Sequence, residues 1–435
     1  MIRKRVITGL LGCIGLIPLS AQQQKVLTIE ELFELADAHS KSLKVHQLAV
    51  DEAIQAIKVA KNDRLPSLEA SLSFSYIGDE WMSDRDFSNG MKAEMPHWGN
   101  NFAFKATQAV YTGGAISTGI EMSELQKKMA EAELDNDQQN VRFMLVGHYL
   151  DLFQLHNQKQ VYEKNIEQTR LLIKEIESAF EQGTALKSDI TRYELQLKNL
   201  ELGRTNVSNR IRILNRQLVT TIGLETNTEI FPDTTLLSMN LDKKNELHWQ
   251  NERNNAPVMQ LADLGIQMSE RQQNLIRAGR RPTIGLMASN NFDGPILIEV
   301  PPINKNFNYW FVGVNVTYKF DSLFKNNKKL KQAKLATLKA QESKRLADEQ
   351  LSNGINAAYI QLEEAYTRLD TKEKSVQLAH ENYEVVHSRY LNGLSLVTDM
   401  LDASNIQLSS ELELANAQIG ILYQYFMLKK TVGTL

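Results

Sequence analysis

The chain contains an internal repeat, and this repeat limits the folds that the sequence can adopt. Residues 145–190 align without a gap to residues 355–400, at a constant offset of 210 residues. Such a duplication predicts two copies of one supersecondary unit. The matching positions are Leu145, Tyr149, Leu152, Ile166, Phe180, Gly183, Leu186, Ser188, Asp189 and Ile190, which fall on Ile355, Tyr359, Leu362, Val376, Tyr390, Gly393, Leu396, Thr398, Asp399 and Met400.

Each half of the chain has the same predicted order: a helix, two strands, and a long helix pair that turns at a glycine. We expect a signal peptide at 1–21, a first repeat at 22–224, a polar connector at 225–254, and a second repeat at 255–435. The connector is interpreted as a small side domain. The first helices are expected at Ile29–Asn62 and Val258–Ala278, the strands at about 67–77, 101–111, 283–291 and 309–320, and the turns at 183 and 393.

The N-terminus has the pattern of an export signal. Arg3, Lys4 and Arg5 precede an apolar run from Val6 to Leu19, and small residues follow at Ser20 and Ala21. This order is typical of a secretory signal peptide, and the run is too short to span a membrane. Leu10-Leu11-Gly12-Cys13 offers a less favoured alternative, lipidation at Cys13. Cys13 is the only cysteine, so thiol nucleophiles, cysteine zinc sites and internal disulfides are excluded from the rest of the chain.

The predicted strands alternate strictly between apolar and polar residues. Leu68, Leu72 and Phe74 share one face of the first strand, whereas Ser71 and Ser73 share the other. About ten residues suffice for a tilted strand to cross a membrane. The alternative is a half-buried sheet in a soluble domain. Four membrane strands cannot close a barrel alone, so we expect several copies to share one, 8 strands from two or 12 from three.

Two long stretches, from Ser117 to about Phe180 and from Lys329 to about Tyr390, contain no proline. Each predicts a helix of roughly 60 residues, or about 90 Å at the rise of an α-helix. Apolar residues recur at spacings of three and four, as on a packed coiled-coil face. Because such helices cannot bury their faces inside a compact globule, we expect a bundle or tube.

Composition excludes several classes of protein. The chain has 49 basic and 52 acidic residues, a balance that argues against a nucleic-acid partner. Mean hydropathy is −0.34, and no long apolar stretch follows the export signal, which excludes a polytopic helical membrane protein. The eight histidines are scattered and no phosphate-binding glycine loop occurs. We therefore expect no enzyme activity, no metal and no cofactor.

Several motifs resemble the TolC family of outer-membrane channel proteins. The stretch from Arg389 to Ala403 resembles the family's helix-to-helix turn, and Phe180–Ile190 repeats it with Thr184 in place of leucine. Gln108–Gly114 resembles the strand-to-helix segment, although Ala109 stands where proline is usual. The resemblance implies a mainly helical fold: a homotrimer whose four strands per protomer form a 12-stranded barrel in outer-membrane lipid, above a helical tube in the periplasm.

The resemblance also implies partners for the two turns. A periplasmic adaptor would dock there and connect the tube to an inner-membrane pump of the RND or ABC class. The residues concerned are Gly183, Thr184, Ala185, Leu186, Gly393, Leu394, Ser395 and Leu396.

Four residues near the turns are predicted to line a pore or gate. Asp399 and Asp402 lie three apart on one helix face, so three copies would form stacked carboxylate rings that attract cations. The alternative is that Asp399 complements the helix N-terminus beside a capping Thr398. The same alternative is favoured for Asp189. Tyr390 matches a gate tyrosine of the family.

Tryptophans near strand ends are candidates for an aromatic girdle at the membrane interface. Trp310 is the best of them, and Trp81 and Trp98 are interpreted as decorating outer loops.

These expectations lead to an outer-membrane exit duct for a tripartite efflux or type I secretion system, which conducts passively. A general diffusion porin is the first alternative, but it would not need duplicated turns on long helices. A periplasmic coiled-coil adaptor is the second, and it leaves the alternating strands unexplained. The substrate, the pump class and the resting state of the duct are left open.

Overall fold

The computed structural model describes residues 24–233, 244–299 and 301–435. The predicted signal peptide and Cys13 lie outside these residues. The chain forms two compact units that both draw on each repeat. Among the described residues, unit 1 comprises 24–41, 141–233 and 358–427, and unit 2 comprises 42–140, 244–299, 301–357 and 428–435.

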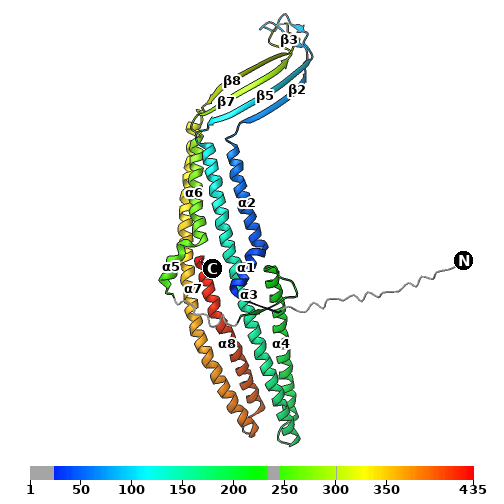
Figure 1. The fold of residues 1–435 in the computed structure, drawn as a ribbon, viewed down its shortest axis with the longest axis vertical. Coiled ribbons are helices and arrows are strands. Elements are labelled where there is room, and N and C mark those ends of the chain that lie inside the picture. The colour runs from blue at the N-terminus through cyan, green and yellow to red at the C-terminus, as the bar shows by residue number, and fades with distance from the viewer. Residues whose placement is uncertain (1–23, 234–243, 300) are drawn as a thin grey trace, which may run out of the picture. The chain divides into compact units, whose positions relative to one another are not determined.

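A four-stranded antiparallel sheet dominates unit 2 (Figure 1). Its strands are β2 (Ser67–Tyr76), β5 (Trp98–Tyr111), β7 (Thr283–Gly294) and β8 (Phe307–Thr317), in the order β2-β5-β7-β8. The two repeats thus meet at the β5–β7 pair, which continues from Asn100–Gly294 to a bulge at Ala109–Tyr111. Among the described residues, β2 pairs only with β5, and β8 only with β7.

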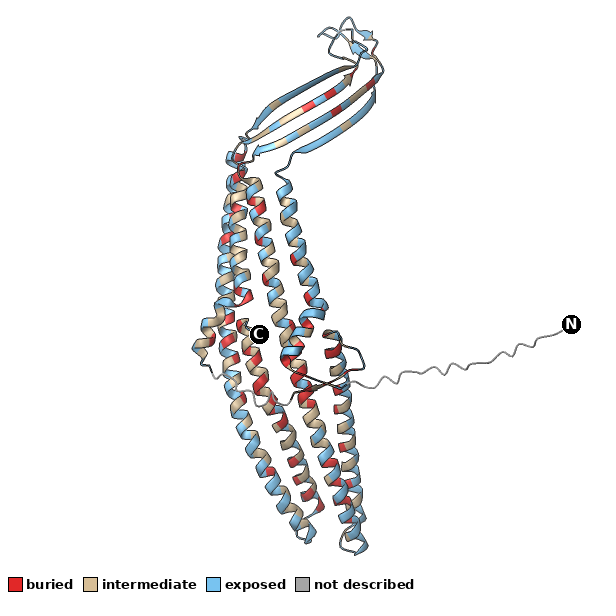
Figure 2. Cartoon of the chain, viewed as in Figure 1, coloured by how far each residue is buried: buried red, intermediate tan, exposed pale blue. Residues whose placement is uncertain are grey.

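One face of this sheet is largely apolar along all four strands, with Asn290 of β7 and Gln108 of β5 among its polar exceptions. Leu72 and Phe74 of β2 are 62% and 75% exposed, and Val312 of β8 is 71% exposed. The strands are coloured mostly as exposed or intermediate in Figure 2. Exposed β-branched and aromatic residues in such a continuous surface are suited to lipid and unsuited to water.

The strand-to-strand connection after β2 contains a small hairpin that the sequence did not predict. β3 (Glu80–Met82) pairs antiparallel with β4 (Met91–Ala93) inside the expected loop. Strands of three residues carry too few alternating positions to be recognised by their pattern. Lys92 of β4 contacts Asp79 at 2.6 Å.

Helices α2 (Lys41–Asn62) and α6 (Pro257–Ala278) precede the two strand pairs. In the sequence, Pro66 and Pro282 follow these helices, where proline cannot continue a helix. The single helix expected over 29–62 is divided: α1 (Ile29–His39) ends at Ser40, which is extended and buried.

Unit 1 contains a two-stranded parallel sheet that joins the N-terminal segment to the connector. β1 (Gln24–Leu27) pairs with β6 (Glu229–Pro232). The buried Tyr149 hydroxyl donates to the Leu27 carbonyl at 2.5 Å and accepts from the Asp233 N–H at 2.7 Å. Burial raises the pKa of Tyr149 to about 12. Tyr149 thus joins the adjacent C-terminal ends of β1 and β6 to α3 (Ala115–Glu181). The connector also contains α5 (Glu246–Glu252), which belongs to unit 2.

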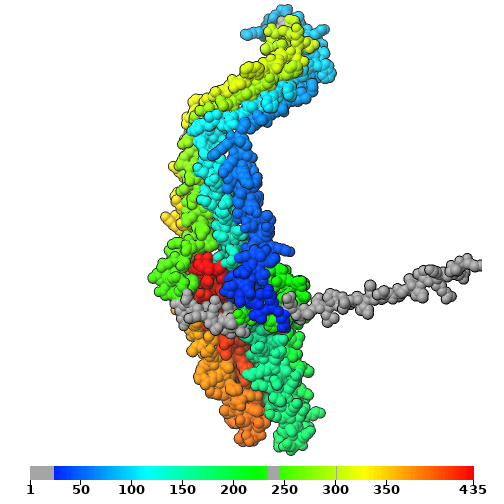
Figure 3. Space-filling model, in the orientation of Figure 1, coloured from blue at the N-terminus to red at the C-terminus, as the bar shows by residue number. Residues whose placement is uncertain are grey.

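Each of the two very long helices is followed, after a turn, by a shorter helix. α3 (Ala115–Glu181) has 67 residues and α7 (Ser322–Leu391) has 70, longer than the roughly 60 expected. α4 (Lys187–Thr221) follows α3, and α8 (Val397–Val432) follows α7. The ends of both pairs lie together in unit 1 (Figures 1 and 3). Within the described ranges, no helix is apolar over enough length to cross a bilayer.

Candidate functional site

The two helix turns have the same backbone geometry. Gly183 has φ +76° and Gly393 has φ +70°, in the left-handed region that favours glycine. The Gly183 N–H donates to the Phe180 carbonyl, and the next N–H reaches back five residues to Ala179. Gly393 and Leu394 repeat this pair of bonds with Tyr390 and Arg389. Both turns are therefore Schellman motifs, which satisfy the last carbonyls of α3 and α7.

In both turns, an aspartate caps the N-terminus of the helix that follows. The Asp189 carboxylate accepts from the Leu186 N–H at 3.2 Å, and Asp399 accepts from the Leu396 N–H at 3.0 Å. The Ser395 hydroxyl adds a second bond to Asp399 at 3.0 Å. Thr398, the expected capping residue, lies inside α8, which begins at Val397, and the capped N–H is that of Leu396. A carboxylate at this position also complements the helix dipole.

A hydrophobic cluster joins the two helix pairs directly behind the turns. Ile176 of α3, Tyr193 of α4 and Met400 of α8 are buried, and Tyr383 and Tyr390 of α7 pack against them. The predicted gate residue Tyr390 is therefore part of this cluster, half-buried rather than free. Burial raises the pKa of both Tyr383 and Tyr390. The cluster fixes how the four helix ends approach one another.

Tyr193 is the most buried polar residue of this cluster. It is 1% exposed, and its hydroxyl has no hydrogen-bond partner among the described residues. Burial raises its pKa, and the neighbouring Tyr383 and Tyr390 act in the same direction. On its surface side, His387 of α7 lies 3.3 Å from the Glu175 carboxylate of α3 and stacks on Tyr383. Sequence reasoning did not select these residues, because their proximity depends on packing between helix pairs.

The turns expose apolar side chains at their tips. Leu186, Leu394 and Leu396 are 67%, 68% and 69% exposed. Thr184 is bound to its own turn, since its hydroxyl donates to the Ala179 carbonyl, and Ala185 packs against the hydrophobic cluster. Asp402, one turn beyond Asp399, is exposed on α8. The surface formed by these residues combines three exposed leucines with carboxylates.

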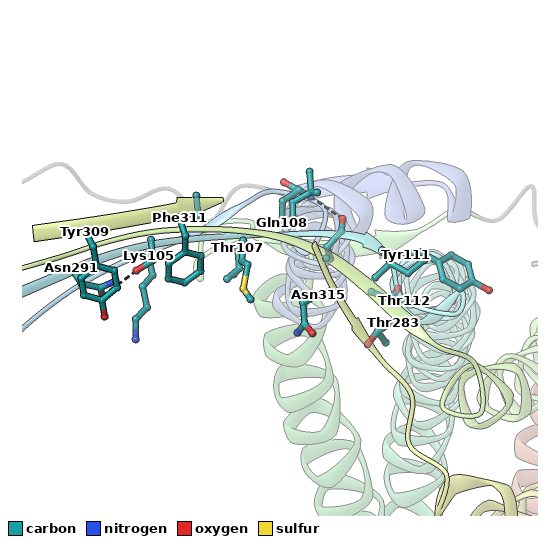
Figure 4. Close-up of a pocket in the computed structure, with 17 residues that line it drawn as sticks. Lys105, Thr107, Gln108, Tyr111, Thr112, Thr283, Asn291, Tyr309, Phe311 and Asn315 are labelled. Atoms are coloured by element: carbon teal, nitrogen blue, oxygen red, sulfur yellow. Dashed lines mark hydrogen bonds between the residues drawn. The ribbon is translucent and has the colours of Figure 1, made fainter. Parts of the chain in front are cut away.

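The second candidate region is the face of the sheet opposite the apolar one. Lys105 of β5, Ser289 and Asn291 of β7, and Tyr309 and Phe311 of β8 project from it (Figure 4). They line a hollow of about 680 Å³ within unit 2. The Ser289 hydroxyl donates to Asn291 Oδ1 and both side chains are buried, whereas Lys105 and Tyr309 are exposed to a solute.

Three of the four tryptophans lie in the same sheet or in the loop after β2, and the fourth, Trp249, is buried in α5. Trp310, the fourth residue of β8, lies on the apolar face and is 73% exposed. Trp98 begins β5 and packs edge-on against Tyr76, the last residue of β2. Trp81 lies in β3. Trp98 is therefore part of the sheet and not of an outer loop, whereas the girdle position of Trp310 stays a prediction.

No group of histidine, cysteine, aspartate and glutamate able to hold a metal occurs in the part of the chain that the structure describes. The features that stand out are instead a sheet with one lipid-compatible face and long helix pairs ended by duplicated turns. Together they define a channel component of an outer membrane.

The chain belongs to the outer membrane efflux protein family, whose model matches residues 32–224 and 249–434. The match in two segments confirms the predicted duplication. The protein is thus an outer-membrane exit duct for efflux that extends into the periplasm.

Solved structures of other membrane proteins, several of them described as channels, have the same fold. CusC matches with a TM-score of 0.77 and 12% identity, over 93% of this chain and 91% of that one. VceC from Vibrio cholerae matches with a TM-score of 0.73 and 15% identity, over 93% of this chain and 96% of that one. MtrE of Neisseria gonorrhoeae, solved in its open state, matches with a TM-score of 0.71 and 17% identity, over 93% of this chain and 88% of that one. At these identities the likeness concerns the fold. A search of curated protein sequences finds no match.

Proposed function

We propose that three copies of this chain form one continuous duct, which receives substrate from a periplasmic adaptor and an inner-membrane pump and releases it outside the cell. The observation that carries the proposal is the sheet with two free edges. β2 and β8 run in opposite directions in the order β2-β5-β7-β8, so β8 of one copy can pair antiparallel with β2 of the next. Head-to-tail pairing around a ring removes every open edge.

The ring of three copies would contain 12 strands and place the apolar face against lipid. Unpaired backbone groups of an edge strand are costly in a bilayer, which favours closure. The number of copies rests on membership of the family, because the sheet itself closes equally well with other multiples of four strands. The polar face with Lys105 and Asn291 would then line the lumen.

The adaptor is proposed to dock at the two turns. Leu186, Leu394 and Leu396 are exposed at the tips, and exposed apolar groups at such positions favour a protein partner. The two turns are near-copies, so one adaptor surface can engage either of them. The turns contain no nucleotide-binding motif, and energy would come from the partner pump. Both an RND-type and an ABC-type pump are compatible with this arrangement.

Asp399 and Asp402 are proposed to form two carboxylate rings at the periplasmic entrance. Both are exposed on α8, three residues apart, and therefore share a helix face. Asp189 and Tyr390 contribute to the same region through the first turn and the cluster behind it. Rings of carboxylates favour the entry of cations. Capping by Asp399 and attraction of cations are compatible, because a capped carboxylate keeps its charge.

Single-cysteine labelling tests the proposed membrane topology directly. The chain has no cysteine after Cys13, so each introduced thiol is unique in the mature protein. Leu72→Cys and Ser71→Cys place thiols on opposite faces of β2, next to each other in sequence. We expect a membrane-impermeant maleimide to label Ser71→Cys through the lumen and to leave Leu72→Cys unlabelled in proteoliposomes. Equal labelling of both would contradict the membrane face.

Channel conductance tests the proposed duct, and the mass of the native assembly tests the number of chains in it. We expect the purified mature protein to form cation-selective channels in planar bilayers and to run as three chains in native mass spectrometry. Large, weakly selective channels with no adaptor binding would favour a diffusion porin. A water-soluble protein without conductance would favour the adaptor alternative.

A further inference from the structure

Three aromatic residues form a column on the polar face of β8. Phe307, Tyr309 and Phe311 alternate along the strand, so their side chains project on the same side. The rings of Phe307 and Tyr309 are stacked, with centroids 5.5 Å apart and an interplanar angle of 14°. Through β7, the residues paired with this column are Asp293, Asn291 and Ser289. The column thus belongs to the face proposed to line the lumen.

Apart from Met287 of β7, the other three strands of this face carry small or polar residues. On β2 they are mostly serines, and on β5 they include Lys105 and Thr107. The lumen side of a membrane sheet is ordinarily polar, because it contacts water. Tyr309 and Phe311 are 43% and 44% exposed there, although nothing in the alternation of β8 requires aromatic rings on both faces. Two aromatic side chains are thus exposed on an otherwise largely polar face.

A hollow beside the column has the size and lining of a small-molecule site. Its volume is about 680 Å³, within the range that holds drug-sized ligands. Tyr309 and Phe311 of β8 and Lys105 of β5 line it and extend to the same side of the sheet (Figure 4), and Ser289 and Asn291 lie on the intervening strand β7. Lys105, Ser289 and Phe311 lie in one row across β5, β7 and β8. Two strand spacings place Lys105 and Phe311 about 10 Å apart at the backbone.

The chemistry of this row selects a particular kind of molecule. Aromatic rings bind other aromatic rings by stacking and apolar contact. The Lys105 ammonium has only donors, so a group that approaches it must accept hydrogen bonds. Glu69 pairs with Lys105 from β2, on the side away from Phe311. A ligand acceptor therefore approaches Lys105 from the β7 and β8 side, next to the rings.

We propose that this hollow is a binding site for aromatic amphiphiles, molecules that join a planar ring system to an acceptor group such as a carboxylate or sulfonate. The inference rests on the proposed function, because it takes this face as the lumen. The ring stacks on Tyr309 and Phe311, and the acceptor contacts Lys105. Such a molecule reaches the hollow from the lumen of the strand segment.

Current block in planar bilayers tests the site. The probe is naphthalene-2-sulfonate, added to both sides, and methanesulfonate is the control with the same charge and no ring. We expect the naphthyl probe to interrupt the current for resolvable times and methanesulfonate to have no such effect. The double variant Tyr309→Leu/Phe311→Leu should shorten the interruptions about tenfold or more. Tyr309→Phe, which keeps the ring, should leave them unchanged.

Two further variants separate the parts of the proposed site. Lys105→Gln should shorten the interruptions, whereas Phe104→Leu, the same kind of change on the apolar face of β5, should not. Equal block in wild type and in the Tyr309→Leu/Phe311→Leu variant would overturn the inference, as would equal block by methanesulfonate.

A protein that does not conduct would overturn the proposed function instead. Fluorescence anisotropy of the naphthyl probe with the amphipol-solubilised protein then decides the binding site alone. Binding that weakens in the double leucine variant would support the site, and unchanged or absent binding would overturn it.

Discussion

Asp189 and Asp399 occupy equivalent positions in the two repeats and make the same bond. Each carboxylate accepts a hydrogen bond from the backbone N–H three residues before it, at 3.2 Å from Leu186 and 3.0 Å from Leu396. The duplication has therefore preserved a helix-capping interaction at both turns. Only the second turn adds Ser395 as a further donor and Asp402 as a second carboxylate.

Capping and cation attraction by Asp399 can be separated by two substitutions. Asp399→Asn keeps an acceptor oxygen but removes the charge, whereas Asp399→Ala removes both. We expect both variants to lower cation selectivity in bilayers. Only Asp399→Ala should also destabilise the turn, by about 1 kcal/mol, seen as faster hydrogen exchange at the start of α8. Asp402→Asn is the control, expected to change selectivity without loosening the helix. Unchanged selectivity in all three would leave Asp399 as a cap alone.

Alanine in place of the turn glycines should destabilise the tips through the backbone alone. A Cβ at Gly183 or Gly393 would meet no atom within 4 Å, so no steric clash contributes. The left-handed φ values predict a cost of about 1 kcal/mol for Gly393→Ala. Gly420→Ala, at an open helical position of α8, is the matched control and should be neutral or stabilising. Limited proteolysis at the turns would measure the difference. No change in cleavage at Gly393→Ala would contradict the backbone explanation.

The hydroxyl of Tyr193 is expected to be dispensable for stability, in contrast to its ring. The ring is buried among Ile176 and Met400, whereas the hydroxyl lacks a partner among the described residues. Tyr193→Phe should therefore leave thermal stability unchanged or raise it, and Tyr193→Ala should cost about 3–5 kcal/mol. Burial raises the pKa of Tyr193, so the folded form favours the neutral phenol. Stability contributed in this way is present below the ordinary tyrosine pKa and is lost as the pH rises above it. Tyr193→Phe should unfold less readily in alkali than wild type.

The burial of His156 predicts that the folded protein loses stability as the pH falls. Burial lowers its pKa, with Lys159 acting in the same direction, and its ring lies 5.1 Å from that of Phe231. The folded protein thus binds a proton at His156 less readily than the unfolded chain. Its contribution is complete above the ordinary histidine pKa of about 6.5 and is lost as the pH falls below it. Thermal unfolding at pH 7.5 and 5 should show a smaller shift for His156→Gln than for wild type. An identical shift would contradict the assignment.

Charge placed on the two faces of β2 should have opposite consequences. Leu72 lies on the apolar face and Ser73 on the polar face. Arginine on a lipid face costs about 2–4 kcal/mol at the bilayer midplane. We therefore expect Leu72→Arg to reduce membrane assembly strongly. Ser73→Arg should assemble normally and shift ion selectivity towards anions. Normal assembly of both variants, measured by heat-resistant oligomer on gels, would argue against lipid contact at Leu72.

The sequence alone determined the local elements of this protein. Pro66 and Pro282 follow the first helices of the two repeats, alternation revealed the faces of β2 and β8, and Gly183 and Gly393 marked the turns. These features depend on residues within one element, so periodicity and backbone preferences are sufficient. The break at Ser40 was missed because it does not interrupt the apolar pattern of the helices on either side of it. The β3–β4 hairpin was missed because strands of three residues are too short to show alternation.

Tertiary structure alone decided which distant elements meet. The order β2-β5-β7-β8, the parallel pairing of β1 with β6, and the contact of His387 with Glu175 join residues up to 212 positions apart. The column of Phe307, Tyr309 and Phe311 was present in the sequence, but its position opposite Lys105 depends on strand register. Register between distant strands is set by the packing of whole faces and not by local preference. The long-range part of the site therefore becomes visible only in the folded chain.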